Sequence, residues 1–189
     1  MNVSEALKNN EEKILPLWIE RTLDTYISSD FFKRSQDSFA NPVGANIRAG
    51  LTKLFRLIIA GAEPNGLAEP LDQIIRIRAV QEFTPSQAVA PVLELKKVVR
   101  QVFSADKEYR ELLAGPGLTA FDCDVDRAAL KAFDLYMECR EQLYKARIRE
   151  LKSGSYILTD STCASALIRE NLRETASEGD CGNCAADKA

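Results

Sequence analysis

The stretch LDQIIRIRAVQEFTPSQAV, residues 71–89, carries two arginines inside a largely apolar run. Its apolar residues recur at helical spacing and cover most of a helix circumference: Leu71, Ile74, Ile75, Ile77 and Val80. A helix that is apolar on most sides is buried, so we expect this one to lie in the core. Arg78 therefore points where a hydrophobic side chain would be expected, whereas Arg76 lies closer to the remaining polar face.

The same stretch also contains a helix boundary. Thr84 can cap a helix, Pro85 suits its first position, and Gln87 stands three residues after the cap. This arrangement is a capping box with its proline. Because the residue before a proline resists the helical conformation, the two helices must separate at Thr84.

The sequence leaves two roles open for Arg78. In the first, Arg78 is a buried arginine paired with a carboxylate, and the pair holds two helices in register. Burying a charge without a partner is costly, so we expect the guanidinium to bond to a carboxylate or to carbonyl groups at a helix end. In the second, Arg78 belongs to a site for an anion or a protein partner, with Arg76 and Gln81 contributing.

The rest of the chain also shows helical periodicity. Asn41 and Pro42 begin a helix with a cap and a first-position proline, and its apolar residues recur at steps of three and four through Ile58. A long helix is predicted from near Asp122 or Asp124 to Gly154. No segment alternates with the period of two that strands require. We therefore predict an all-α fold, a single globin-like or bundle-like domain of about five to seven helices.

Composition narrows the classes of function. The chain has 189 residues, 46% of them hydrophobic, and a net charge of −3 without a basic block. A protein that binds nucleic acid usually shows a basic stripe. We therefore do not expect nucleic acid to be a partner of this protein. The longest apolar stretch is far shorter than the ~20 residues of a membrane span. The first residues do not read as a secretory signal, and we expect a cytoplasmic protein.

Histidine is absent from the sequence. This excludes nucleophilic catalysis by Ser–His or Cys–His pairs, and zinc sites that need two histidines. No pair of acidic residues stands out in an apolar setting either. Chemistry by carboxylates, lysine or tyrosine stays open, but we expect no enzyme and assign no catalytic residue.

The five cysteines are read differently according to their position. Cys123 and Cys139 fall in the long helix and are predicted to be small core residues. Cys181 and Cys184 form the motif CGNC, whose spacing could grip a metal ion or form a redox pair. A structural zinc site needs four ligands. Cys163 would have to supply the third, and a second chain would have to complete the set. Free thiols, a reversible disulfide, and zinc or an iron–sulfur cluster all stay open, and no cofactor is expected.

Three segments together resemble a known family. They are LPLWIERT at 15–22, NPVGANIRAGLTKLFRLI at 41–58 and RIRAVQEFTPSQAV at 76–89. Residues 7 to about 152 resemble the N-terminal domain of RsbR-type (RsbRD) co-antagonist proteins of bacterial stress signalling. The resemblance implies a helical, usually dimeric domain that acts by protein contact and senses a signal. Relatives often continue into a second regulatory domain, whereas this chain is expected to be a stand-alone version.

These observations give one prediction of organisation and function. Residues 1–154 form the helical domain, and residues 155–189 form a tail with one short helix, at about 162–176, and the CGNC motif. The protein is expected to be a non-catalytic regulatory or sensor domain that forms a homodimer and binds another protein. One alternative is a small redox or metal-binding accessory protein that acts through Cys181 and Cys184. Another is a ligand sensor with a pocket between helices, which an apolar pocket with Arg78 at its wall would favour.

Overall fold

The computed structural model describes residues 2–27, 29–34, 40–81 and 83–153. Within these ranges the chain forms seven α-helices and two short 3-10 helices, and no strand occurs there. The predicted all-α fold is confirmed. The chain divides into two units, Met1–Gln142 and Leu143–Ala189. The short helix predicted at about 162–176 lies outside the described residues.

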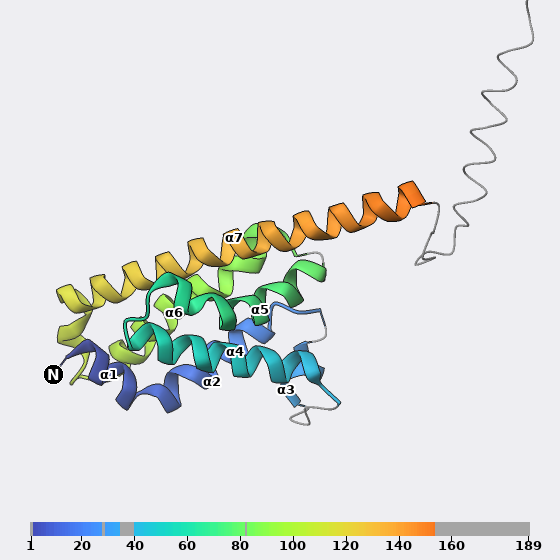
Figure 1. Cartoon of the computed structure of the whole chain (residues 1–189). Coiled ribbons are helices and arrows are strands. Elements are labelled where there is room, and N and C mark those ends of the chain that lie inside the picture. Colours follow the sequence, from blue (N-terminus) through green and yellow to red (C-terminus); the bar gives the residue numbers. More distant parts are fainter. Residues whose placement is uncertain (1, 28, 35–39, 82, 154–189) are drawn as a thin grey trace, which may run out of the picture. The chain divides into compact units, whose positions relative to one another are not determined.

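The helices follow one another with short connections (Figure 1). In chain order the elements are α1 (Val3–Asn9), α2 (Glu11–Leu23), α3 (Ser29–Arg34), α4 (Pro42–Ile59), η1 (Pro64–Leu67), α5 (Ala68–Val80), α6 (Pro85–Ala105), η2 (Arg110–Ala114) and α7 (Pro116–Ser153). The break predicted at Thr84 is present, and the capping box is formed: the Thr84 hydroxyl accepts from the Gln87 amide, and the Gln87 side chain accepts from the Thr84 amide. Asn41 caps α4, because its side-chain oxygen accepts from the Gly44 amide at 2.8 Å.

Four helices enclose the core of the first unit. α4 packs against α2 and α5, and α6 packs against the same two helices, so the four form a closed ring of contacts. Their inward side chains are fully or almost fully buried, among them Trp18, Leu51, Phe55, Ile74 and Leu95. The apolar patterns of the sequence therefore converge on one core, which fixes how α5 and its arginines are oriented.

Gly50 permits the close approach of α4 and α5. A Cβ atom at this position would lie 2.8 Å from Cγ1 of Ile74 and 3.3 Å from the main-chain oxygen of Pro70. Contacts below 3.0 Å are not tolerated in well-packed interiors, so any side chain here would push α5 away. Glycine thus brings the helix that bears Arg78 close to α4.

The long helix begins earlier than its sequence suggested. α7 starts at Pro116, because Pro116 follows Gly115 and takes a first-turn position that needs no amide hydrogen. Its buried residues in the first unit recur at steps of three and four: Leu118, Phe121, Val125, Ala128, Ala132 and Tyr136. Cys123 falls between these positions and is exposed, and Cys139 is half-buried. The prediction that both are core residues is wrong for Cys123.

Candidate functional site

Arg78 is a fully buried charge near the end of α5. Its exposed fraction is 0%, as expected from its place on the apolar side of that helix. No described carboxylate forms an ion pair with it; the pairs found involve other arginines and lysines. The first role considered for Arg78, a buried ion pair between helices, therefore lacks its acidic partner among these residues.

The partner of Arg78 is a main-chain oxygen that a proline leaves available. Nη2 of Arg78 donates to the carbonyl oxygen of Gln87 at 2.9 Å. In an unbroken helix this carbonyl would accept from the amide four residues later, but that residue is Pro91, which has no amide hydrogen. Pro91 inside α6 thus creates the acceptor that Arg78 uses.

Two aromatic rings cover the guanidinium. Its Cζ atom lies 4.1 Å from the ring centroid of Phe83 and 4.9 Å from that of Tyr26, distances typical of cation–π contacts. The two ring centroids are only 5.2 Å apart, in an edge-to-face arrangement. Rings on opposite faces of the guanidinium would be much farther from each other, so both rings stand on one side of Arg78.

Several polar atoms of this cluster have no hydrogen-bond partner among the described residues. They are Nε and Nη1 of Arg78 and the hydroxyl oxygen of Tyr26. Burial raises the pKa of Tyr26, and the nearby positive charge of Arg78 opposes this rise. Burial likewise lowers the pKa of Arg78, with Tyr26 opposing it. Buried polar groups in proteins are nearly always satisfied, so unused donors on a buried cation require an explanation.

A pocket of about 660 Å³ adjoins this cluster. Its lining comprises residues 25–27, Phe32, Val80, Gln81, Phe83 and Gln87. Arg78 lies directly behind this wall, because three of the residues that contact it, Tyr26, Phe83 and Gln87, line the pocket. The pocket is therefore lined mainly by aromatic and aliphatic groups and backed by a positive charge.

The connection between α5 and α6 is fastened to α7. The hydroxyl of Tyr136 donates to the carbonyl oxygen of Phe83 at 2.5 Å, and Nη1 of Arg140 donates to the carbonyl oxygen of Ala79 at 3.1 Å. The amide of Phe83 donates in turn to the Arg78 carbonyl at 3.3 Å. The main chain of Phe83 is thus held on both sides, while its side chain covers Arg78.

The residues that the sequence placed in one site occupy different positions. Gln81 lines the pocket, whereas Arg76 is exposed and pairs with Asp72, one turn earlier on α5, at 2.6 Å. Cys181 and Cys184 lie outside the described residues, so their metal and thiol alternatives stay predictions. The sequence analysis did not identify Tyr26 and Phe83, although Phe83 directly precedes the helix start at Thr84.

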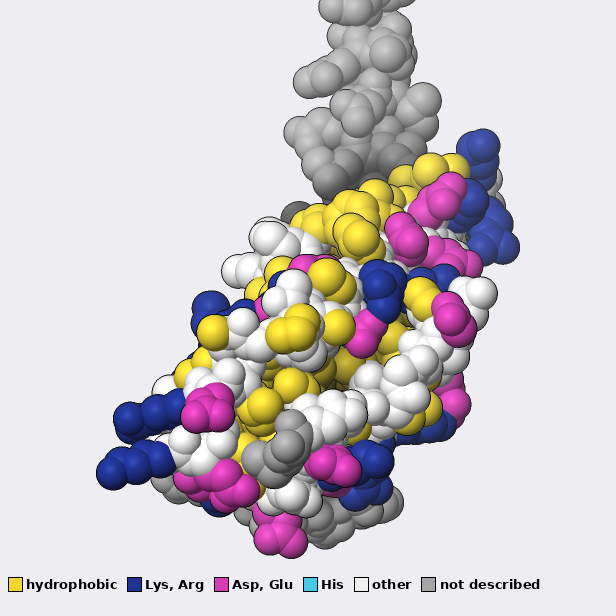
Figure 2. Space-filling view, turned by 90° about the vertical axis from the view of Figure 1, so that its left-hand side faces the viewer, with side chains coloured by type: hydrophobic (Ala, Val, Ile, Leu, Met, Phe, Trp, Pro, Cys, Tyr) yellow, Lys and Arg dark blue, Asp and Glu magenta, His cyan; other side chains and the backbone are white. Residues whose placement is uncertain are grey.

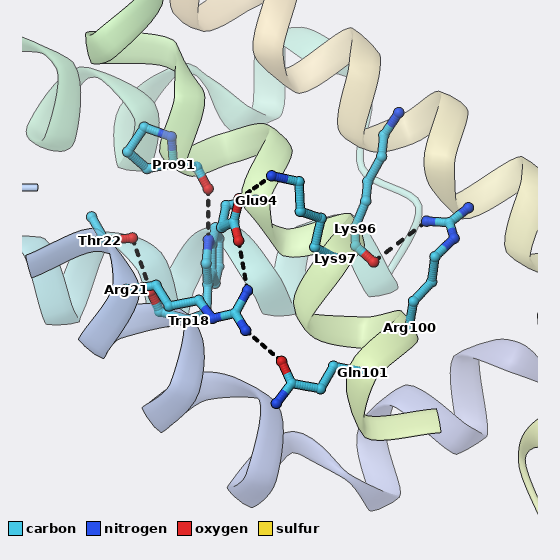
Figure 3. Close-up of polar contacts among 9 residues, drawn as sticks. All are labelled: Trp18, Arg21, Thr22, Pro91, Glu94, Lys96, Lys97, Arg100 and Gln101. Atoms are coloured by element: carbon cyan, nitrogen blue, oxygen red, sulfur yellow. Dashed lines mark hydrogen bonds and ion pairs between the residues drawn. The ribbon is translucent and has the colours of Figure 1, made fainter. Parts of the chain in front are cut away.

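A second polar cluster joins α2 to α6 (Figure 3). Nε1 of Trp18 donates to the Pro91 carbonyl at 2.7 Å, and Arg21 pairs with Glu94 at 2.6 Å. Lys97 approaches the other carboxylate oxygen of Glu94 at 2.9 Å. Burial by itself would raise the pKa of Glu94, but the hydrogen bonds from Lys97 and Arg21 outweigh it, so the pKa is lowered. This cluster fastens α2 to α6 through the side chains of Trp18, Arg21 and Glu94.

The described part of the chain was also searched for metal ligands and membrane spans. It contains no group of three or more His, Cys, Asp or Glu side chains placed to hold a metal ion. None of its helices combines the length and apolar character needed to cross a bilayer.

Fold and site together define an all-α domain with an arginine-backed pocket between the turn after α2 and the junction of α5 with α6. The family described as the RsbT co-antagonist protein RsbRD N-terminal domain matches residues 12–151. The chain belongs to this family, and the resemblance noted in the sequence is confirmed. No curated protein and no solved structure matches the chain.

Proposed function

We propose that this protein is a non-catalytic regulatory domain of bacterial signalling that acts as a homodimer and through contact with another protein. Membership of the RsbRD N-terminal domain family supports a stressosome-related signalling role. The absence of histidine removes the side chain that most often serves in acid–base catalysis at neutral pH, which is consistent with a non-catalytic role. Cysteines that stay as free thiols suit a reducing compartment. We therefore place the protein in the cytoplasm.

The observation that carries this proposal is a row of exposed hydrophobic side chains on α7. Leu130, Phe133 and Met137 are 68%, 44% and 48% exposed, at steps of three and four along the helix. Ile148 and Leu151 in the second unit are also about half exposed and three residues apart. Figure 2 shows one face of the molecule, on which hydrophobic side chains are exposed among charged ones.

A second copy of the chain is the occupant that suits this row best. Residues 130, 133 and 137 repeat with the spacing of the a and d positions of a heptad, which pack two helices against each other. Acidic and basic side chains, such as Asp134 and Lys131, flank the row on α7. An apolar seam with charges of both signs at its border is typical of helices that pair with a copy of themselves.

The test is the mass of the protein in solution. We expect light scattering to give twice the 21.0 kDa of one chain. Phe133→Glu places a charge in the seam and should weaken self-association by about tenfold or more, because burying an unpaired charge is costly. Lys107→Glu, at an exposed position in the turn after α6, is the matched control and should leave the mass unchanged. A single-chain mass for the unaltered protein at about 100 µM would contradict the homodimer.

A further inference from the structure

We propose that the pocket beside Arg78 binds a small organic carboxylate with a flat apolar body. This inference goes beyond self-association, because it concerns the first unit alone and does not need the α7 seam. It starts from a charge that the described fold does not neutralise, and from a cavity next to that charge.

The buried positive charge of Arg78 would be neutralised by a bound anion. A guanidinium stays protonated even when burial lowers its pKa, so Arg78 carries a full positive charge inside the protein. The carbonyl of Gln87 satisfies one nitrogen, and within the described part of the chain Nε and Nη1 keep N–H donors without an acceptor. Guanidinium donors are arranged to bind carboxylates through paired hydrogen bonds. A bound carboxylate would supply both the missing acceptors and the missing negative charge.

The residues around Arg78 determine the chemistry of the rest of the ligand. The pocket presents the rings of Tyr26, Phe32 and Phe83 and the aliphatic side chains of Ile27 and Val80. Its volume of about 660 Å³ lies within the range of roughly 300–1,000 Å³ that small-molecule sites occupy. An aromatic or branched aliphatic acid matches this lining, whereas inorganic phosphate would leave the apolar wall unused.

The ligand reaches Arg78 by replacing an aromatic ring. Both rings that cover the guanidinium stand on one side of it, and both line the pocket. The main chain of Phe83 is held by hydrogen bonds with Arg78 and Tyr136, so only its side chain needs to rotate. The Tyr26 hydroxyl, for which the described residues offer no partner either, is then available to donate to the carboxylate.

A ligand in this pocket would affect the contact between the α5–α6 connection and α7. Phe83 is bonded to Tyr136 of α7, and the neighbouring Ala79 carbonyl is bonded to Arg140 of the same helix. A ligand that displaces the Phe83 side chain therefore acts on the residue that α7 holds. This consequence rests on the proposed function, whereas binding itself does not.

Calorimetric titration with benzoate, isovalerate, benzamide and inorganic phosphate tests the proposal. We expect both acids to bind in a saturable way, with dissociation constants of about 0.1–1 mM. Benzamide has the shape of benzoate without its charge and should bind about tenfold more weakly, or not measurably. Phosphate binding as strong as that of benzoate would show a bare anion site and overturn the ligand class.

Two substitutions assign the binding to this pocket. Arg78→Met should weaken benzoate by about tenfold or more, whereas Arg76→Met, on the exposed face of the same helix, should leave it unchanged. If Arg78→Met does not fold, Val80→Trp decides: Val80 is 61% exposed and lines the pocket, so tryptophan fills the space without disturbing the core. Benzoate binding that survives either substitution, or no saturable binding to the unaltered protein up to about 10 mM, refutes the site. A scattering measurement on the same samples reports self-association separately.

Discussion

Replacing Arg78 with methionine measures whether this buried charge has a counter-charge. Methionine keeps most of the apolar stem and removes the guanidinium. The substitution leaves the Gln87 carbonyl without its partner, at about 1–3 kcal/mol, and removes two cation–π contacts of about 1–2 kcal/mol each. It also removes the desolvation penalty of a buried ion, which is several kcal/mol.

These contributions oppose each other, so the free energy of unfolding should change by less than about 2 kcal/mol in Arg78→Met. Arg78→Ala should be clearly worse, by about 2–5 kcal/mol, because it also empties the volume of a long side chain that is 0% exposed. Urea unfolding, followed by the fluorescence of the single tryptophan and by circular dichroism, gives both values.

One result would refute this reasoning. If Arg78→Met destabilised the protein by about 3–5 kcal/mol, as expected when the partner of a buried ion pair is left alone, a carboxylate must face Arg78 in solution. Arg76→Met is the control for loss of an arginine on this helix. Its ion pair is exposed, so the substitution should cost less than about 1 kcal/mol.

Four further predictions concern other parts of the chain. Trp18→Phe removes the donor to a carbonyl of α6 and should lower the free energy of unfolding by about 2–4 kcal/mol in urea. Gly50→Ala should lower the melting temperature, because the strain of overpacking, about 1–3 kcal/mol, exceeds the gain in helix propensity of about 1 kcal/mol. The pKa of Glu94 is lowered in the folded protein, so its charge contributes to the free energy of unfolding above the unfolded value of 4.5. This contribution is lost as the pH falls through the folded pKa. Glu94→Gln should therefore cost less than about 1 kcal/mol at neutral pH and nothing in acid. Purified protein should carry no stoichiometric metal, and any zinc bound in a titration should be lost in the double Cys181→Ser, Cys184→Ser variant.

Three of these four predictions, those on Gly50, Glu94 and the CGNC motif, have a control that could contradict them. Gly66→Ala is the matched glycine control, because the nearest atom to its added Cβ lies at an ordinary 3.7 Å; an equal loss in both variants would show that the contact at Gly50 is not the cause. A difference between Glu94→Gln and the unaltered protein that persists in acid would mean that charge is not responsible. Equal zinc uptake by the full chain and the double cysteine variant would show that CGNC is not a metal site.

The sequence by itself determined the helices and several of their boundaries. The break at Thr84 follows from local chemistry, because a proline restricts the residue before it and a capping box needs only four consecutive residues. Asn41 and Pro42 start α4 for the same kind of reason. The start of α7 at Pro116 carried the same local signal and could have been recognised from it. The burial of Arg78 followed from the helical period of its neighbours.

Only the tertiary structure decided what surrounds Arg78. Tyr26 comes from the turn after α2, Phe83 from the loop after α5, and the Gln87 carbonyl from the first turn of α6, so the site joins segments up to about sixty residues apart. Periodicity reports which side of a helix is buried, but it does not report which helix faces it. The carbonyl that Arg78 uses is available because Pro91 lacks an amide hydrogen, and its position against α5 is set by the packing of four helices around one core.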